Sequence, residues 1–156
     1  RGITRFTWDE KLKTTKINDT LYRIQMNGNV QMLHKGLDGV VGRLTSEQLD
    51  AIAVDPNKVE TNADGRSEIV LKGMDLQQLQ AKGSVYIETE SRAVDCDVFD
   101  YNLRTGIAKL TADKNRTLAI LTQGSPYPVR ANSIIWNMDP AVDTITITGL
   151  QGSSSN

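Results

Sequence analysis

Two segments of the chain alternate apolar and polar residues in the same pattern, and each has a glycine at the same point. The apolar and small positions are Ile24, Met26, Gly28, Val30 and Met32 in the first segment, and Leu79, Ala81, Gly83, Val85 and Ile87 in the second. A third copy begins with Ile145, Ile147 and Gly149. Alternation with a period of two predicts strands that have one apolar face. Its recurrence predicts a fold built from one repeated unit.

A second pattern recurs between these segments. Residues 96–101 and 131–136 each begin with a small residue, have a large apolar residue three places on, and reach an aromatic residue two places later. A turn follows each of them, at residues 104–106 and at residues 139–140. Residues 46–51 fit the same pattern more weakly. The predicted unit is therefore a strand with an inner glycine, a turn, and a strand with small and aromatic residues.

Turn signals separate the expected strands at intervals of about 8–12 residues, a spacing typical of an all-β domain. The connections are too short for parallel crossovers, so neighbouring strands are expected to be antiparallel. Two segments allow more than one interpretation. Asn27 and Gly28 form either a hairpin turn or a bend inside one long strand. Residues 43–54 begin like a capped helix, but the repeat register favours a strand.

The composition changes this picture little. A chain of 156 residues suits one domain, which we place at residues 1–150, with at least two repeats, followed by a flexible tail at residues 151–156. The formal net charge is −1, from 18 basic and 19 acidic residues, which gives no electrostatic footprint for a nucleic acid. No apolar run is long enough for a membrane-spanning helix. The sequence begins at Arg1, so we expect a trimmed or processed segment.

The residue types that most catalytic and metal sites need are scarce. His34 is the single histidine and stands near a predicted turn, where we expect a solvated side chain. Cys96 lies between Asp95 and Asp97, whose charges raise a thiol pKa, so we expect a small strand residue and no reactive thiolate. Together with Asp100, these two aspartates are expected on the solvated face of a strand. We therefore expect no catalytic residue, metal ion or cofactor, and no enzymatic activity.

Residues 76–87 resemble the strand with small, glycine and apolar positions that is found in OstA-like domains, the LptA/LptC-type lipopolysaccharide transport proteins. Residues 96–106 and 131–149 are similar to the strands that follow it in that repeat. The resemblance covers residues 24–150; the N-terminal part fits less well, and residues 55–78 look like an insertion. It implies an antiparallel sheet folded over into a V, or β-jellyroll. It also implies a location in the periplasm of Gram-negative bacteria and a role in outer-membrane biogenesis.

In the family that the chain resembles, the inner apolar face shelters acyl chains. The ligand implied here is lipopolysaccharide or another acylated glycolipid, each buried CH₂ contributing about 0.8 kcal/mol. Eleven apolar residues are candidates for the lipid-facing interior. They are Ile24, Met26, Val30, Met32, Leu79, Val85, Ile87, Phe99, Tyr101, Ile134 and Trp136. The same residues would also fill an ordinary β-sandwich core, and the sequence alone leaves both interpretations open.

Two classes of function follow from this pattern. The first is a lipid-binding, bridge-forming module whose sheet edges pair with a second copy or with other transport components. The second is a β-sheet scaffold or interaction domain without a lipid ligand. A hydrolase is a weaker interpretation, because no carboxylate lies in an apolar run that would raise its pKa. The domain could belong to a longer repeat protein, or be tethered to a membrane by a segment outside this sequence.

Overall fold

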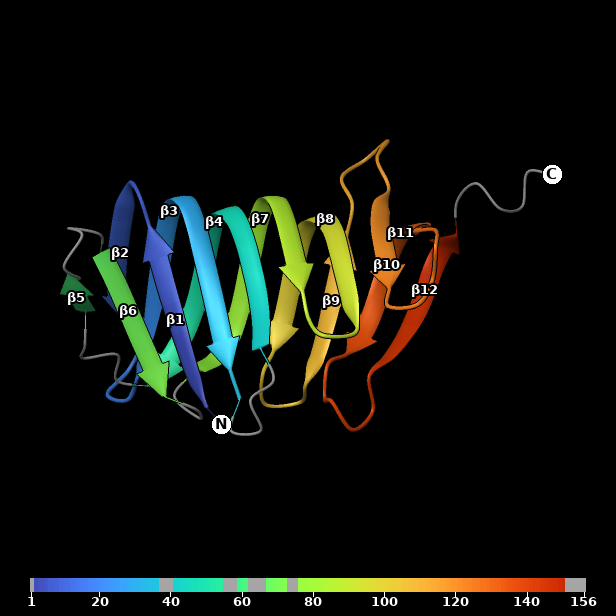
Figure 1. Cartoon of the computed structure of the whole chain (residues 1–156). Helices are drawn as coiled ribbons and strands as arrows, with labels where there is room; N and C mark the ends of the chain where they lie inside the picture. The colour runs from blue at the N-terminus through green and yellow to red at the C-terminus, as the bar shows by residue number, and fades with distance from the viewer. Residues whose placement is uncertain (1, 37–40, 55–58, 62–66, 73–75, 151–156) are drawn as a thin grey trace.

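The computed structural model describes residues 2–36, 41–54, 59–61, 67–72 and 76–150. In these residues the chain forms strands only, and every pairing between strands is antiparallel. The strands make one continuous sheet (Figure 1). The all-β, antiparallel fold expected from the sequence is therefore confirmed. The tail expected at residues 151–156 lies outside the described residues.

Several strands are long and bend in the middle. The strands are β1 (Ile3–Trp8), β2 (Lys11–Lys16), β3 (Leu21–Lys35), β4 (Val41–Val54), β5 (Val59–Thr61), β6 (Ser67–Lys72), β7 (Leu76–Glu88), β8 (Arg92–Asn102), β9 (Ile107–Thr111), β10 (Leu118–Thr122), β11 (Val129–Asn137) and β12 (Thr144–Leu150). Both ambiguous segments are settled by these bounds: Asn27 and Gly28 lie inside β3, and residues 43–54 belong to β4.

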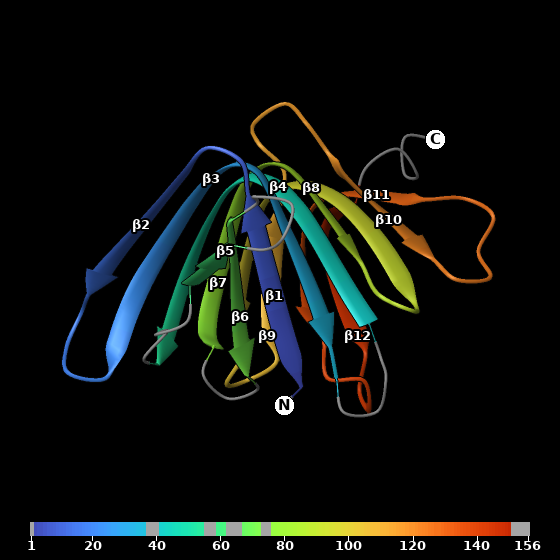
Figure 2. The same cartoon turned by 60° about the vertical axis from the view of Figure 1, so that its left-hand side comes forward.

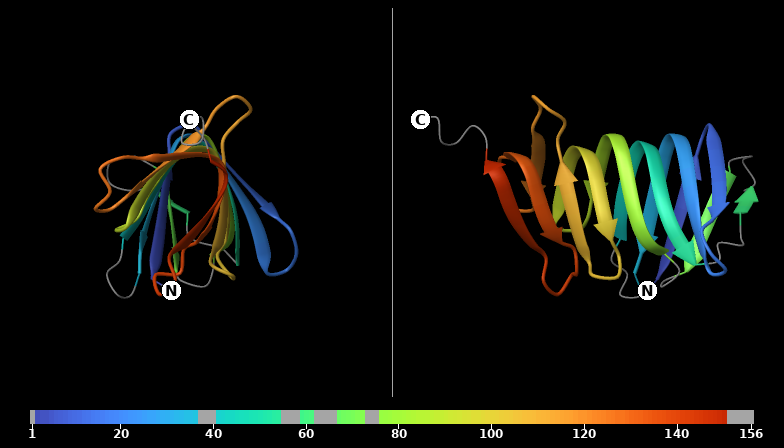
Figure 3. Two further views of the ribbon diagram at one scale, coloured as in Figure 1. Left: turned by 90° about the vertical axis from the view of Figure 1, so that its right-hand side faces the viewer. Right: turned by 180° about the vertical axis from the view of Figure 1, so that it is seen from behind.

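The bends line up from strand to strand and divide the sheet into two walls (Figures 2 and 3). The register between β3 and β4 shifts between Asn27 and Val30, and the register between β7 and β8 shifts between Lys82 and Val85. The β4–β7 pair shifts between Thr45 and Gln48. We call this row of bends the fold line. Each long strand crosses it and so contributes one half to each wall.

The pairing pattern defines the two walls. Wall 1 consists of β2, residues 21–27 of β3, 48–54 of β4, 76–82 of β7, 98–102 of β8, β9, residues 133–137 of β11 and 144–148 of β12. Wall 2 consists of β5, β6, β1, residues 30–35 of β3, 41–46 of β4, 85–88 of β7, 92–96 of β8, β10 and residues 129–131 of β11. The walls diverge from the fold line, which gives the sheet the shape of a V.

The recurring glycines of the sequence all lie on the fold line. Gly28, Gly83 and Gly149 have φ angles of +86°, +83° and +67°, in the left-handed region that glycine adopts at little cost. A Cβ atom at Gly83 would lie 2.9 Å from the Cβ atom of Glu47 on the neighbouring strand. At Gly149 it would lie 2.9 Å from the Cβ atom of Asn132. The glycines therefore provide both the bend and the room that the next strand needs.

The core fills the space between the walls. Apolar side chains from both walls point inward and form one cluster, to which β1 contributes Phe6 and Trp8 and β6 contributes Ile69 and Leu71. Residues 55–78, which look like an insertion in the sequence, include β6, and β6 pairs with β1 along its whole length. The inward apolar side chains of β6 extend wall 2 beyond the edge that β1 would otherwise leave open.

Replacing Gly83 with alanine tests the fold line. We expect Gly83→Ala to destabilise the protein by about 2–4 kcal/mol, because the new Cβ atom both adopts a left-handed φ and collides with Glu47. Gly124→Ala is the matched control: Gly124 has a φ of +85° but no atom within 4 Å of the added Cβ. It should cost only about 1 kcal/mol. Urea unfolding measures both, and equal losses would show that the fold line has no special packing requirement.

Candidate functional site

A cavity of about 440 Å³ lies between the two walls, on the side where the V is open. Its volume falls in the range of about 300–1,000 Å³ that is typical of small-molecule sites. Most of the lining side chains are apolar. They are Met32, Leu44, Leu76, Leu79, Ile87, Phe99, Tyr101, Leu103, Met138 and Pro140, with Thr4, His34, Gly36, Gly42, Arg43, Glu88 and Thr89 completing the lining. We call this cavity the trough.

All eleven residues proposed for the interior have inward-facing side chains. Nine are buried, and Met32 and Tyr101 are partly buried against the same core. Five of the eleven line the trough: Met32, Leu79, Ile87, Phe99 and Tyr101. The other six fill the packed core. They are Ile24, Met26, Val30, Val85, Ile134 and Trp136. One inner face thus forms the core in one part and the trough in another.

The bulges explain which lining residues the alternation pattern missed. Leu76 breaks the inward phase of Leu79 and Ala81, because the β4–β7 register shifts at Gln77 and returns Leu76 to the inner face. Leu103 and Met138 lie just past the ends of β8 and β11 and continue the alternation of Tyr101 and Trp136, but they were not among the eleven candidates. To predict that Leu76 faces inward, one would have to know that the register shifts at Gln77, and a single sequence does not show this shift.

Aromatic side chains form one side of the trough. The rings of Phe99 and Tyr101 are tilted by 47° with their centroids 5.6 Å apart, a favourable arrangement for an aromatic pair. Burial raises the pKa of the Tyr101 phenol above its usual value of 10.0, and the charge of Asp139 adds to this increase. Tyr101 therefore presents a neutral, largely apolar surface to the trough at physiological pH.

We expected a solvated side chain at His34, but it lies on the inner face and is only partly exposed. It continues the inward phase of Val30 and Met32, and the structure pairs it with Thr4 of β1. The Thr4 hydroxyl and His34 Nδ1 are 2.8 Å apart, and Thr4 is buried. The expectation failed because a turn follows His34 only after the strand has kept its alternation through Lys35. Together with Arg43, these residues make the rim of wall 2 polar.

A turn crosses the open side of the V near the C-terminal end of the trough. This turn, residues 138–143, joins β11 to β12, and we call it the strap. Asp139 O accepts hydrogen bonds from the amides of Val142 and Asp143, at 2.9 and 2.8 Å. The Met138 amide donates to Gly106 O, 2.8 Å away in wall 1. The strap is therefore a well-bonded segment, and its residues Met138 and Pro140 line the trough.

Asp143 fastens the strap to wall 2. Its carboxylate accepts hydrogen bonds from Ser91 Oγ at 2.8 Å and from Arg92 Nε at 3.3 Å. The indole Nε1 of Trp136, in wall 1, donates to the same carboxylate at 2.9 Å. Arg92 Nη2 also donates a hydrogen bond to the main-chain oxygen of Asp143 at 3.0 Å. The polar contacts of a single side chain thus join the two walls across the mouth.

Several effects act on the pKa of Asp143. Desolvation by burial raises it, but the hydrogen bonds from Trp136 and Ser91 and the charge of Arg92 outweigh this effect. The net result is a pKa below the ordinary value of 3.8. The carboxylate is therefore ionised, and the strap is fastened, at neutral pH.

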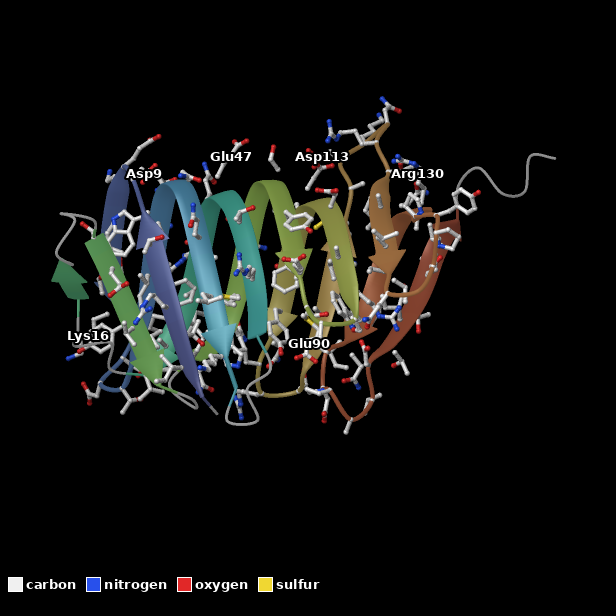
Figure 4. All side chains as sticks on the ribbon, in the orientation of Figure 1. Asp9, Lys16, Glu47, Glu90, Asp113 and Arg130 are labelled. Atoms are coloured by element: carbon white, nitrogen blue, oxygen red, sulfur yellow. The ribbon has the colours of Figure 1, made fainter. Side chains whose placement is uncertain are left out.

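We expected Asp95, Asp97 and Asp100 on a solvated face. Asp95 and Asp100 are exposed, but Asp97 is buried at the fold line. The alternation stops at the bend, where Cys96 and Asp97 are both buried. Asp97 accepts hydrogen bonds from the Asp113 amide at 2.7 Å and from Arg116 Nε at 3.1 Å. It thereby holds the turn between β9 and β10. Figure 4 shows Asp113 on the bent side of the sheet, together with Asp9 and Glu47.

Cys96 has the inert character expected of it. Burial raises the pKa of its thiol to about 12, and the carboxylates of Asp97 and Asp95 add to this increase. Burial therefore has a larger effect on this thiol than the two carboxylates that flank it in the sequence. A thiol with this pKa is not a nucleophile at physiological pH.

The two ends of the sheet differ in chemistry. In the described part of the chain, β12 pairs only with β11 and β2 only with β3. β2 carries Lys11, Lys13 and Lys16, which protect an edge strand against further pairing. β12 carries threonines and isoleucines, and its inner-face residue Ile147 is 40% exposed. The C-terminal edge is therefore the less protected of the two.

Comparison of the chain with family models, curated proteins and solved structures gave no match. Among the described residues, no three His, Cys, Asp or Glu side chains gather as they would around a metal ion. The described part of the chain also has no helix that could cross a membrane.

Replacing Asp143 with asparagine tests the fastening of the strap. We expect Asp143→Asn to lower the free energy of unfolding at pH 7 by about 1 kcal/mol, because it removes a charge that three donors share. A group whose pKa is lowered on folding stabilises the protein above its unfolded pKa and loses this effect as the pH falls through the folded value. The difference from wild type should therefore shrink as the pH falls below about 4.

Asp50→Asn is the matched control for this measurement. Asp50 also pairs with an arginine, since Arg23 Nη2 lies 3.2 Å from its carboxylate, but the pair lies on the outer face of wall 1. Loss of such an exposed pair should cost about 0–1 kcal/mol. Urea unfolding at several pH values measures both variants. A difference for Asp143→Asn that does not change with pH would contradict the role given to its charge.

Proposed function

We propose that this chain is a non-enzymatic lipid-binding and bridging module of the OstA-like type, acting in lipopolysaccharide transport in the periplasm of Gram-negative bacteria. The trough carries this proposal, because most of its lining is apolar, it is open on one side and it lies between two walls of one sheet. The resemblance of residues 76–87 to OstA-like strands supports it as well.

The lining of the trough suits acyl chains. An acyl chain needs a continuous apolar surface, which Leu79, Phe99 and Leu103 of wall 1 provide opposite Met32, Leu44 and Ile87 of wall 2. Burial of about ten methylene groups would contribute about 8 kcal/mol before the costs of binding are subtracted. Methionine side chains adapt to ligands of different shape, which suits a trough that accepts acyl chains of different length.

The rim suits a polar headgroup. His34, Arg43 and Thr4 lie at the edge of wall 2, where a ligand whose acyl chains are in the trough would place its polar part. Arginine is the side chain best adapted to phosphate and carboxylate groups. The ligand class that fits best is lipopolysaccharide or another acylated glycolipid. The proposal needs no cofactor or metal ion, and the near-neutral charge gives no reason to include a nucleic acid.

The C-terminal edge suits pairing with a neighbouring sheet. Strand addition would satisfy the free backbone groups of β12, and the apolar inner face at Ile145 and Ile147 would continue into the neighbour. The neighbour can be a second copy of this chain or another transport component. A row of such modules would extend the trough, which is the geometry that a lipid bridge between two membranes requires.

Crosslinking tests the location of the ligand. We expect p-benzoylphenylalanine in place of Tyr101 to capture lipopolysaccharide on irradiation, because Tyr101 lines the trough. Tyr86 is the matched control, an aromatic residue next to Asp95 on the outer face of wall 2. The same probe there should capture at least about tenfold less, since ligand contact is confined to the buried inner face.

The products are separated by electrophoresis and identified by mass spectrometry of the captured lipid. Equal capture at positions 101 and 86 would contradict a ligand in the trough. No capture at either position, with sheet-edge association intact, would favour the scaffold function without a lipid ligand.

A charged substitution tests the C-terminal edge. We expect Thr146→Lys to weaken self-association at least about tenfold, because lysine on an edge strand opposes the approach of another strand. Thr45→Lys is the matched control: Thr45 is also exposed, but its strand is paired on both sides. Analytical ultracentrifugation measures the association of both variants. Equal association of Thr146→Lys and wild type would contradict pairing through β12.

A further inference from the structure

The strap has a geometry that its role as a turn does not require. A connection between β11 and β12 needs only to link two neighbouring strands of wall 1. Residues 138–143 instead reach across the mouth of the V, line the trough with Met138 and Pro140, and contact Ser91 and Arg92 of wall 2. The segment therefore closes part of the mouth through which a ligand of the trough would pass.

The fastening is polar and concentrated in one residue. Ser91, Arg92 and Trp136 all donate to the Asp143 carboxylate, and Arg92 is held in place by a further hydrogen bond to Thr122 Oγ1 at 3.2 Å. The side chains of Arg92 and Asp143 are 18% and 30% exposed, so water can reach this ion pair when it opens. Charge-assisted hydrogen bonds are stronger than neutral ones, yet they exchange with water without loss of a packed core.

The rest of the strap is held in a different way. The hydrogen bonds of Asp139 O to Val142 and Asp143 lie within the strap, and the Met138 amide bonds to Gly106 of wall 1. These contacts do not cross the mouth. Release of the Asp143 carboxylate would therefore leave the turn intact and attached to wall 1, and the hydrogen bond from Arg92 to Asp143 O would be its one remaining polar contact with wall 2 that the structure shows.

We propose that the strap is a gate for the trough. The hydrogen bonds that Arg92 and Ser91 donate to the Asp143 carboxylate hold it closed. When the carboxylate is bound, Met138 and Pro140 cover the C-terminal part of the mouth and retain the acyl chain. When it is released, the ligand enters or leaves past the strap. This gate depends on the proposed lipid-binding function, since it controls access to the same trough.

A gate has a kinetic signature that a ligand contact lacks. If ligand passes only when the strap is open, the observed association and dissociation rates both scale with the open fraction, and the affinity hardly changes. A residue that merely touches the ligand alters the dissociation rate and the affinity together. The two roles of Asp143 are therefore distinguishable by measuring both rates.

The test uses Asp143→Asn and cis-parinaric acid, a fatty acid whose fluorescence increases in an apolar site. Asparagine keeps the size of the side chain and tolerates the φ of 43° that Asp143 adopts. Stopped-flow fluorescence gives both rate constants. We expect each of them to increase about fivefold, which corresponds to about 1 kcal/mol in favour of the open strap, while Kd stays within about twofold of wild type.

Asp50→Asn, which removes the same charge from the outer face, should leave both rates unchanged. Ser91→Ala removes a single donor and should increase both rates by a smaller factor, which keeps the test available if Asp143→Asn folds poorly. Unchanged rates in both strap variants, or an increase in dissociation alone, would overturn the gate while the lipid site stands. No binding of the fatty acid by wild type would overturn the proposed function and the gate with it.

Discussion

The bend that every long strand makes at the fold line is the constraint on which the rest of the structure depends. A flat sheet of these strands would leave its apolar face in water, whereas the bend lets one sheet bury that face against itself. The bend needs a left-handed backbone at Gly28 and Gly83, followed by Asn29 and Ser84, which also have positive φ angles. Glu10, in the turn between β1 and β2, and Glu47 of β4 occupy the space that the missing Cβ atoms leave. One backbone requirement, met once per repeat, therefore determines the V and the cavity inside it.

Because the two walls diverge, the same inner face does two things. Near the fold line the walls are close, and side chains such as Val30 and Val85 pack without access to solvent. Toward the open side the distance between the walls exceeds what the side chains fill, and a trough remains between Met32 and Tyr101. Core and cavity therefore differ in their place on the inner face and not in residue type. This explains why lipid-facing and core interpretations of the same eleven residues could not be separated in the sequence.

Much of the fold could be predicted from the sequence, because period-two alternation and recurring glycines are local signals. Alternation placed Ile24, Leu79 and Ile134 on the inner face, and recurrence placed the glycines at equivalent points. What failed depended on contacts between distant segments. Leu76 faces inward because of a register shift against β4, Asp97 is buried because its strand bends there, and His34 is held by Thr4, thirty residues away. The strap was unpredictable for the same reason, since Asp143 meets Ser91 and Arg92 only in the folded sheet.

The chemistry of the mouth follows from what an apolar trough cannot provide for itself. If apolar packing closed the mouth, the walls would collapse onto each other and remove the cavity, because buried apolar surface gains most when no gap is left. A polar fastener avoids this outcome. Asp143 holds the strap across the gap at a fixed distance while its donors stay in place on both walls, Trp136 on one and Arg92 on the other. The energy of this contact is small compared with that of the core, so the mouth can open while the fold line and the packed half of the V stay intact. A folded sheet of this kind can therefore be stable at its bend and adaptable at its edge.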